Sequence, residues 1–163
     1  MTRTNTPVLL ALAILAIAAA SIAAALVFEA LGYQPCDLCL KERIPYYAAM
    51  PVAGLAVLFA ARRQKSFMRP AFAVLALIFT ASAAFGVYHA GIEWGFWPGP
   101  QECSGVLERA RSAEDFLAQL QSAKVVRCDA AAIRIFGLSL AGWNAVISAG
   151  LAAIALAGTT RTK

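Results

Sequence analysis

Four stretches without a charged residue dominate this chain and limit what it can fold into. They cover residues 8–28, 44–61, 71–92 and 135–157, and they measure 21, 18, 22 and 23 residues. A transmembrane helix needs about 20 mostly apolar residues to cross about 30 Å of hydrocarbon. With 61% hydrophobic and only 14% charged residues, the chain is far from the composition of a water-soluble domain. The sequence predicts an all-α membrane protein, a bundle of four transmembrane helices that forms one integral membrane domain over residues 1–163.

The ends of the four predicted spans carry local signals of their own. The first stretch is longer than the 7–15 residue core of a cleaved signal peptide, so it is predicted to be retained as a span. The second carries Pro45, which suits a first helical turn, and Pro51, which suits a kink. The third ends in the aromatic cluster Trp94, Phe96 and Trp97, as expected at a membrane interface.

The distribution of charge predicts how the bundle is oriented. Cytoplasmic loops next to spans are enriched in Lys and Arg. Four crossings gather seven basic residues and no acidic residue on one side, and all nine acids fall in the opposite loops, 29–43 and 93–134. The basic residues are Arg3, Arg62, Arg63, Lys65, Arg69, Arg161 and Lys163. We therefore expect both termini in the cytoplasm and both of those loops outside it. The alternative, a re-entrant second stretch, would reverse the sidedness, and the charge split argues against it.

The basic character of the chain does not indicate a nucleic-acid binder. Its net charge is +5, but the basic residues lie scattered at the ends of segments rather than on one face.

The second outer loop contains Ser112-Ala-Glu-Asp115, which resembles a capping box and leads into Phe116, Leu117 and Leu120 at helical spacing. This pattern predicts a short amphipathic helix within the long loop.

All four cysteines fall in the two loops predicted to lie outside the cytoplasm. Cys36-Asp-Leu-Cys39 follows Pro35 directly and precedes the second span, while Cys103 and Cys128 lie in the long loop. In a bacterium that side is the oxidising periplasm, where paired thiols form disulfides. A C-x-x-C near a helix N-terminus favours the thiolate. Two pairs on one membrane face indicate a relay of disulfide exchange.

Each cysteine pair also has a plainer interpretation. The C-x-x-C spacing is half of a zinc site, but the chain offers neither a second C-x-x-C nor histidines close in sequence, so no metal is predicted. The same pair could be a short structural disulfide. A Cys103–Cys128 bond could simply staple the long loop, which the chain-entropy estimate values at about 3–4 kcal/mol.

Charged and titratable residues near the C-x-x-C are further candidates. Glu42 suits the dipole of a first helical turn, whereas Arg43 opposes both that dipole and the charge rule. Arg43 lies four residues beyond Cys39 and could share its helical face, next to a thiolate or a bound electron acceptor. The equal alternative is an arginine that reaches the headgroups. His89, at the outer end of the third span, is the only histidine, and such a residue is usually a satisfied polar group.

Taken together, these motifs resemble the disulfide bond formation protein B (DsbB) family of bacterial inner-membrane quinone reductases. The resemblance covers the whole chain. It rests on four spans, on Cys36-x-x-Cys39 followed by Glu42-Arg43, and on Cys103 with Cys128 in the second loop. The approach from Tyr88-His89 to Gly99-Pro100 and the stretch Leu138-Ser-Leu-Ala-Gly-Trp143-Asn are also similar.

The resemblance implies a function and a role for each candidate residue. A reduced periplasmic dithiol oxidase (DsbA-like) would attack the Cys103–Cys128 disulfide, and exchange would pass its electrons to Cys36–Cys39. Cys39 would work against a ubiquinone or menaquinone, assisted by Arg43, with His89 nearby. A different interpretation is a small four-span scaffold or assembly protein whose loop disulfides are structural. A transporter is disfavoured because its spans would be expected to carry charged residues.

Overall fold

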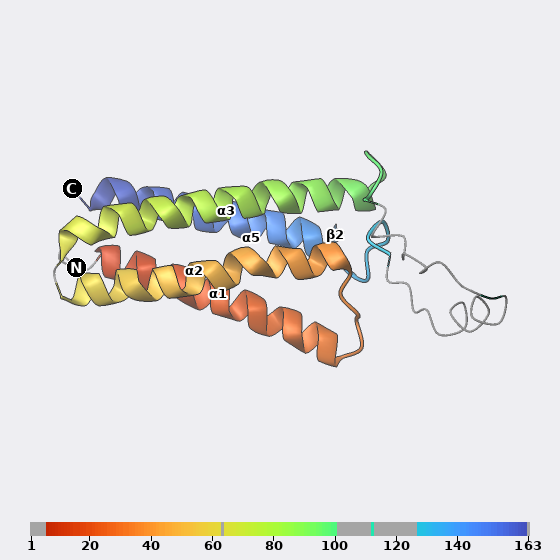
Figure 1. Ribbon diagram of the computed structural model, residues 1–163, viewed down its shortest axis with the longest axis horizontal. Coiled ribbons are helices and arrows are strands. Elements are labelled where there is room, and N and C mark those ends of the chain that lie inside the picture. The colour runs from red at the N-terminus through yellow and green to blue at the C-terminus, as the bar shows by residue number, and fades with distance from the viewer. Residues whose placement is uncertain (1–5, 63, 101–111, 113–126, 163) are drawn as a thin grey trace.

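Four long helices make up most of the chain that the computed structural model describes, which is residues 6–62, 64–100, 112 and 127–162. They are α1 (Thr6–Ala30), α2 (Asp37–Ala61), α3 (Lys65–Glu93) and α5 (Leu140–Arg161). Each is long and apolar enough to cross a membrane, which confirms the predicted four-span class. The helices run side by side (Figure 1). The α2–α3 connection and both chain ends lie at one end, and the α1–α2 connection and strand β2 lie at the other.

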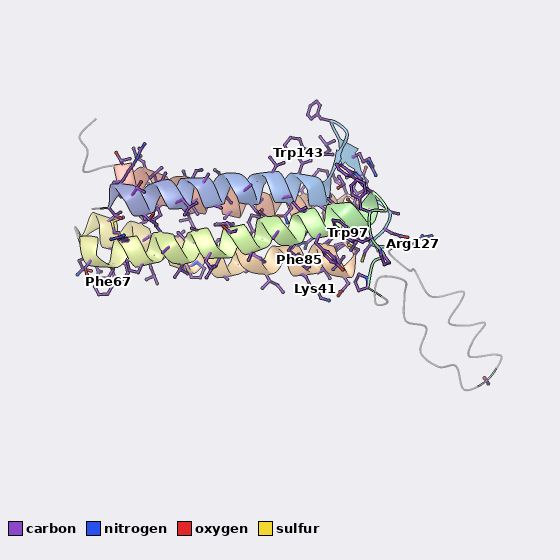
Figure 2. All side chains as sticks on the ribbon, turned by 90° about the horizontal axis from the view of Figure 1, so that it is seen from above. Lys41, Phe67, Phe85, Trp97, Arg127 and Trp143 are labelled. Carbon is purple, nitrogen blue, oxygen red and sulfur yellow. The ribbon has the colours of Figure 1, made fainter. Side chains whose placement is uncertain are left out.

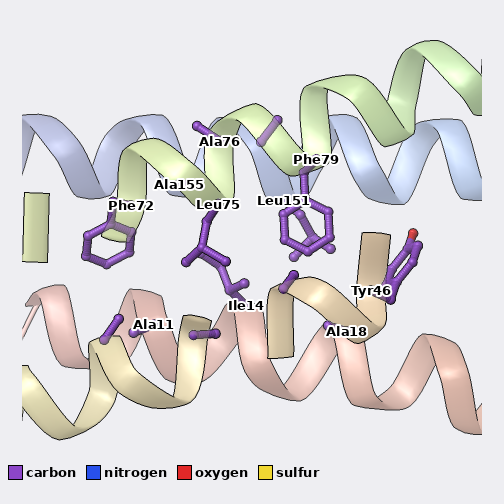
Figure 3. Packing of buried hydrophobic residues seen from close by; sticks show 14 of the residues in the cluster. Ala11, Ile14, Ala18, Tyr46, Phe72, Leu75, Ala76, Phe79, Leu151 and Ala155 are labelled. Atoms are coloured by element: carbon purple, nitrogen blue, oxygen red, sulfur yellow. The ribbon is translucent and has the colours of Figure 1, made fainter. Parts of the chain in front are cut away.

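The helices form a ring in which each packs against two neighbours. Contacts follow the order α1, α2, α3, α5 and back to α1, and the α3–α5 pair is the most extensive. The centre of the ring holds a buried apolar cluster that includes Ile14, Phe72, Leu75, Phe79 and Leu151 (Figure 3). Because lipid is as apolar as these side chains, van der Waals packing supplies most of the association between the helices.

Small residues allow the helices to approach closely. Much of the buried cluster is alanine, with Ala11, Ala49 and Ala155 fully inaccessible. At Gly86 of α3, a Cβ would lie 2.9 Å from the backbone nitrogen of Ala145 on α5. Only glycine fits there without a shift of the neighbouring backbone, so this position sets the spacing of the most extensive helix pair.

Helix α2 starts seven residues before the predicted span, which corrects one expectation. The hydropathy pattern placed the start at residue 44, with Pro45 in the first turn, but Pro45 and Pro51 both lie inside the helix. Cys36 is the N-cap residue, and its side chain accepts a hydrogen bond from the Cys39 backbone N–H. The helix therefore begins in the polar segment outside the apolar stretch. Pro35 lies just before the cap.

The fourth apolar stretch also begins before its helix does. Residues Arg134–Ile135 (β1) and Leu138–Ser139 (β2) pair antiparallel, so the predicted start at 135 lies in a hairpin. Phe136 and Gly137 connect the strands with φ of 52° and 83°, the two positive values that a tight type I′ turn requires. Ser139 then caps α5 by accepting from the Gly142 backbone N–H.

Aromatic side chains gather where the α1–α2 connection and the hairpin lie. Trp97 stacks on Tyr88 and donates from Nε1 to the Tyr88 carbonyl, so the segment after α3 folds back over its last turns. Figure 2 shows Trp97 and Trp143 near this end and Phe67 near the other. The predicted amphipathic helix lies outside the described residues, apart from Ser112.

Candidate active site

The start of α2 brings the two sulfurs of the C-x-x-C into contact. Because Cys36 is the N-cap and Cys39 the third helical residue, both side chains lie on one face of the first turn. Their Sγ atoms are 2.7 Å apart, and both residues are free thiols. The Cys39 backbone N–H also donates to Cys36 Sγ, at 3.2 Å. A negative charge on Cys36 is thus met by two donors at the helix N-terminus.

A buried histidine and a buried carboxylate extend this contact into the bundle. His89 Nε2 lies 3.6 Å from Cys36 Sγ, and His89 Nδ1 lies 3.0 Å from Glu42 Oε1. His89 is fully inaccessible and Glu42 is 8% exposed. Glu42 lies three residues beyond Cys39 on α2, whereas His89 comes from the C-terminal end of α3. Together they form a chain of thiol, imidazole and carboxylate, in which the carboxylate fixes the orientation of the ring.

These contacts alter the acidity of Cys36. The Cys39 thiol donates to Cys36 Sγ and lowers the pKa of Cys36 from 9.0 to about 5, and His89 acts in the same direction against the effect of burial. Since the thiolate is the nucleophile and leaving group in disulfide exchange, Cys36 is chemically suited to exchange near neutral pH.

Cys128 lies in the same buried cluster as Cys36. The cluster contains Cys36, Leu38, Ile92 and Cys128, with Cys39 and Phe85 packed against it. Cys128 is 1% exposed and is disulfide-bonded. The long loop therefore returns one of its cysteines to the C-x-x-C. Cys103 lies outside the described residues.

An ion pair holds Arg43 at the cysteine end of the bundle. Its guanidinium donates to Glu29 Oε2 at 2.9 Å, which links α2 to the last turn of α1. The side chain of Arg43 is 13% exposed. Arg43 and Cys39 border one cavity.

That cavity of about 360 Å³ opens between α1, α2 and α5 at the cysteine end. Figure 1 shows α1 diverging from the other helices toward this end. The lining is mainly apolar, and Cys39, Arg43, Tyr46, Trp143 and Asn144 are among the side chains that border it. Asn144 Nδ2 is buried and has no hydrogen-bond partner among the described residues. A cavity of this size, with few polar groups, suits an apolar ring that carries hydrogen-bond acceptors.

The donor atoms of Cys36, Cys39 and His89 lie within 4.8 Å of one another, close enough to hold a metal ion. The spacing of the sulfurs favours a different use. Two thiolates bound to tetrahedral zinc at about 2.3 Å would lie about 3.8 Å apart, whereas these are 2.7 Å apart. The geometry is closer to that of a redox pair than to that of a zinc site.

Comparison with known proteins agrees with this arrangement. The family model of disulfide bond formation protein DsbB matches residues 7–158. The chain belongs to the DsbB family. The match spans all four helices, so this family member is a multi-pass membrane protein.

One curated relative was also found. The chain is similar to a Rickettsia prowazekii (strain Madrid E) protein named "Uncharacterized protein RP370", with 23% identity over 118 residues. The aligned region makes up 71% of this chain and 66% of that relative, slightly less than two thirds of its length. No solved structure matches the chain.

Three residues of the site were given no role by sequence reasoning. Glu42 was interpreted only through the helix dipole, although it contacts His89, and neither Tyr46 nor Asn144 was assigned to the cavity. A usable signal existed for Asn144, because an amide inside a membrane span usually marks a functional site. Glu42 lies in loop 29–43, outside the predicted spans. Tyr46 carries no such signal in the sequence.

Proposed function

We propose that this protein is a thiol:quinone oxidoreductase of the bacterial inner membrane. It reoxidises a periplasmic, thioredoxin-like dithiol oxidase (DsbA-like) and passes the electrons to ubiquinone or menaquinone. The observation that carries the proposal is that Cys39 borders a mainly apolar cavity together with Arg43, while its sulfur contacts the Cys36 thiol at 2.7 Å. With both termini cytoplasmic, the cysteine end of the bundle faces the periplasm.

The cavity fits a quinone head group in size and in chemistry. It holds about 360 Å³, its walls are mainly apolar, and it offers the Arg43 guanidinium and the unpartnered Asn144 amide as donors. When bound, a quinone supplies the oxidising capacity for two electrons and takes up two protons. Cys39, which borders the cavity, is the sulfur that would act against it.

Electrons reach this pair through two disulfide exchanges. Two thiols of the reduced oxidase convert the Cys103–Cys128 disulfide to two thiols and leave the oxidase with its own disulfide. Cys103 and Cys128 then reduce a Cys36–Cys39 disulfide and return to the bonded state, so the two electrons rest on Cys36 and Cys39. The second exchange is supported by the packing of Cys128 in the same buried cluster as Cys36.

His89 and Glu42 manage the proton of Cys36. His89 Nε2 is 3.6 Å from the sulfur and can take its proton, while Glu42 holds Nδ1 and stabilises the imidazolium. When Cys128 attacks Cys39 and forms a mixed disulfide with it, the Cys36 thiolate leaves, and it is stabilised by His89 Nε2 and by the Cys39 backbone N–H.

An ordinary structural disulfide could not accept electrons from this oxidase, because the free-energy cost would be too large. An oxidase near −120 mV could pass electrons to a structural disulfide below −300 mV only at a cost of roughly 8 kcal/mol. A stabilised Cys36 thiolate raises the potential of its pair, since it favours the reduced form. A lipophilic acceptor in the adjoining cavity then removes the electrons.

The test is quinone reduction by the purified protein with a reduced dithiol oxidase as donor. We expect Cys39→Ser and Cys103→Ser to lose turnover, and Lys41→Gln, on an exposed position one turn along α2, to keep it. Trapping the thiols with an alkylating agent of added mass distinguishes this proposal from the alternative of a scaffold protein with structural disulfides. A scaffold would show unchanging disulfides, whereas a relay would show both pairs cycling with quinone. Normal turnover by Cys39→Ser would contradict the proposal.

A further inference from the structure

A chain of polar side chains crosses the otherwise apolar interior and joins three helices. Tyr46 Oη, on α2, donates to Asn144 Oδ1 on α5 at 2.7 Å and lies 3.0 Å from Ser148 Oγ. Ser148 Oγ in turn lies 2.9 Å from Ser82 Oγ on α3. Tyr46, Ser82 and Ser148 are each no more than 3% exposed. Polar groups inside membrane spans are costly and persist where they are satisfied or serve a function.

The Asn144 amide is satisfied on one side only. Its Oδ1 accepts from the Tyr46 hydroxyl, and this bond fixes the orientation of the amide plane. Its Nδ2 carries two N–H donors, is buried, and contacts no acceptor in the described part of the chain. A buried donor without a partner is energetically unfavourable, so this amide is suited to a ligand that carries an acceptor.

Asn144 and Tyr46 border the same cavity as Cys39 and Arg43. The cavity is therefore bordered by two residues whose side chains carry hydrogen-bond donors, Arg43 on α2 and Asn144 on α5. A para-quinone carries carbonyl oxygens at opposite ends of its ring. An acceptor of that shape can meet both residues, whereas a compound with one carbonyl can meet only one.

We propose that Asn144 is a binding residue that donates from Nδ2 to one carbonyl oxygen of the quinone, and that Tyr46 is the positioning residue that holds its amide. This inference rests on the proposed function and deepens it.

Binding is measured first, without turnover. The full-length protein in detergent, with no thiol donor, is titrated with ubiquinone-1, and the rise in melting temperature gives the affinity. We expect Asn144→Leu to need roughly tenfold more ubiquinone-1 for half of the full shift, as for loss of one hydrogen bond. Ser82→Ala is the matched control. It shortens the same polar chain at a position that does not border the cavity, so it lowers the melting temperature and leaves the affinity unchanged.

Kinetics provide a second readout that a purely structural role would not give. Asn144→Leu should raise the KM for ubiquinone-1 roughly tenfold with little change in kcat, and Tyr46→Phe should raise it by a smaller factor. Oxidation of Cys36 and Cys39 by diamide, which takes the same two electrons and two protons without the cavity, should keep its wild-type rate in both variants. If Asn144→Leu does not fold, Asn144→Ala removes the same donor with less bulk.

The outcomes separate this inference from the proposed function. If the wild-type protein binds and reduces ubiquinone-1 and the Asn144 variants do so with unchanged affinity and KM, the role of Asn144 is refuted and the quinone reductase stands. If the wild-type protein neither binds nor reduces ubiquinone-1, the proposed function itself fails. An affinity loss in Ser82→Ala equal to that in Asn144→Leu would also overturn the inference, since the effect would then come from the helix packing.

Discussion

The lowered pKa of Cys36 predicts that this thiol is almost fully ionised at neutral pH. Its pKa is lowered from 9.0 to about 5, and the hydrogen bond from the Cys39 thiol is the largest cause. At pH 7 a thiol with a pKa near 5 is about 99% thiolate, and one with a pKa near 9 is about 1% thiolate. The contacts around Cys36 therefore correspond to about a hundredfold difference in thiolate population at neutral pH.

Replacing Cys39 with alanine removes that hydrogen bond and leaves the burial that opposes it. We expect the pKa of Cys36 to rise from about 5 toward its ordinary 9.0. A rate at one pH would conceal this change, because thiolate nucleophilicity rises with pKa. With a Brønsted slope of about 0.4–0.5, a rise of four pKa units makes the remaining thiolate roughly 40- to 100-fold more nucleophilic, which offsets much of the loss in thiolate population. The midpoint of the pH profile is the quantity to measure.

The assay is alkylation of Cys36 by iodoacetamide between pH 4 and pH 10, followed by mass spectrometry of the peptide. The reduced protein carries serine at both Cys103 and Cys128, so that only the C-x-x-C thiols react. We expect a midpoint near pH 5, a clearly higher midpoint in Cys39→Ala, and an unchanged midpoint in Lys41→Gln. A midpoint of 8 or above before Cys39 is replaced would refute the reasoning.

The same lowered pKa predicts the sign of a stability change. Since Cys36 has a lower pKa in the folded protein than in the unfolded chain, its thiolate stabilises the reduced fold most at high pH. That contribution is fully present above about pH 9, declines as the pH falls, and is lost below about pH 5. The difference in melting temperature between the reduced protein and its Cys36→Ser variant should therefore narrow as the pH falls from about 9 to about 5.

Three further predictions follow from the packing and from the site. Gly86→Ala places a Cβ 2.9 Å from the Ala145 backbone nitrogen, so we expect a loss of about 1–3 kcal/mol in the free energy of unfolding. Gly150→Ala, where a Cβ would meet open space, should cost much less in the same detergent melting assay. Glu42→Gln keeps the size of the side chain but removes the charge next to the histidine. The second exchange, in which Cys103 and Cys128 reduce the Cys36–Cys39 disulfide, should then slow by about tenfold or more when it is followed by stopped flow after mixing with a reduced oxidase. Arg43→Gln should raise the KM for ubiquinone-1 by about tenfold while single-turnover thiol exchange keeps its rate, and an equal loss in both would contradict the assignment of Arg43 to the cavity.

Helix boundaries illustrate where reading the sequence is reliable and where it is not. Hydropathy indicates where a helix can enter hydrocarbon, so all four spans were predicted from the apolar stretches alone. It does not indicate where backbone hydrogen bonding begins. Helix α2 starts at Asp37 because the Cys36 side chain caps it, seven residues before the apolar stretch. Helix α5 starts at Leu140 because the Phe136–Gly137 turn comes first.

The sequence alone determined the features that depend on neighbours along the chain. The lengths of the four stretches without charged residues predicted the spans, and the three-residue spacing of Cys36 and Cys39 placed the two sulfurs on one helical turn. The tertiary structure decided everything that depends on partners from different helices. His89 meets Cys36 from 53 residues away, Arg43 meets Glu29, and Asn144 meets Tyr46 from 98 residues away. The physical reason is that each such contact depends on how the helices are rotated and spaced, which packing at close positions such as Gly86 fixes and which no local pattern encodes.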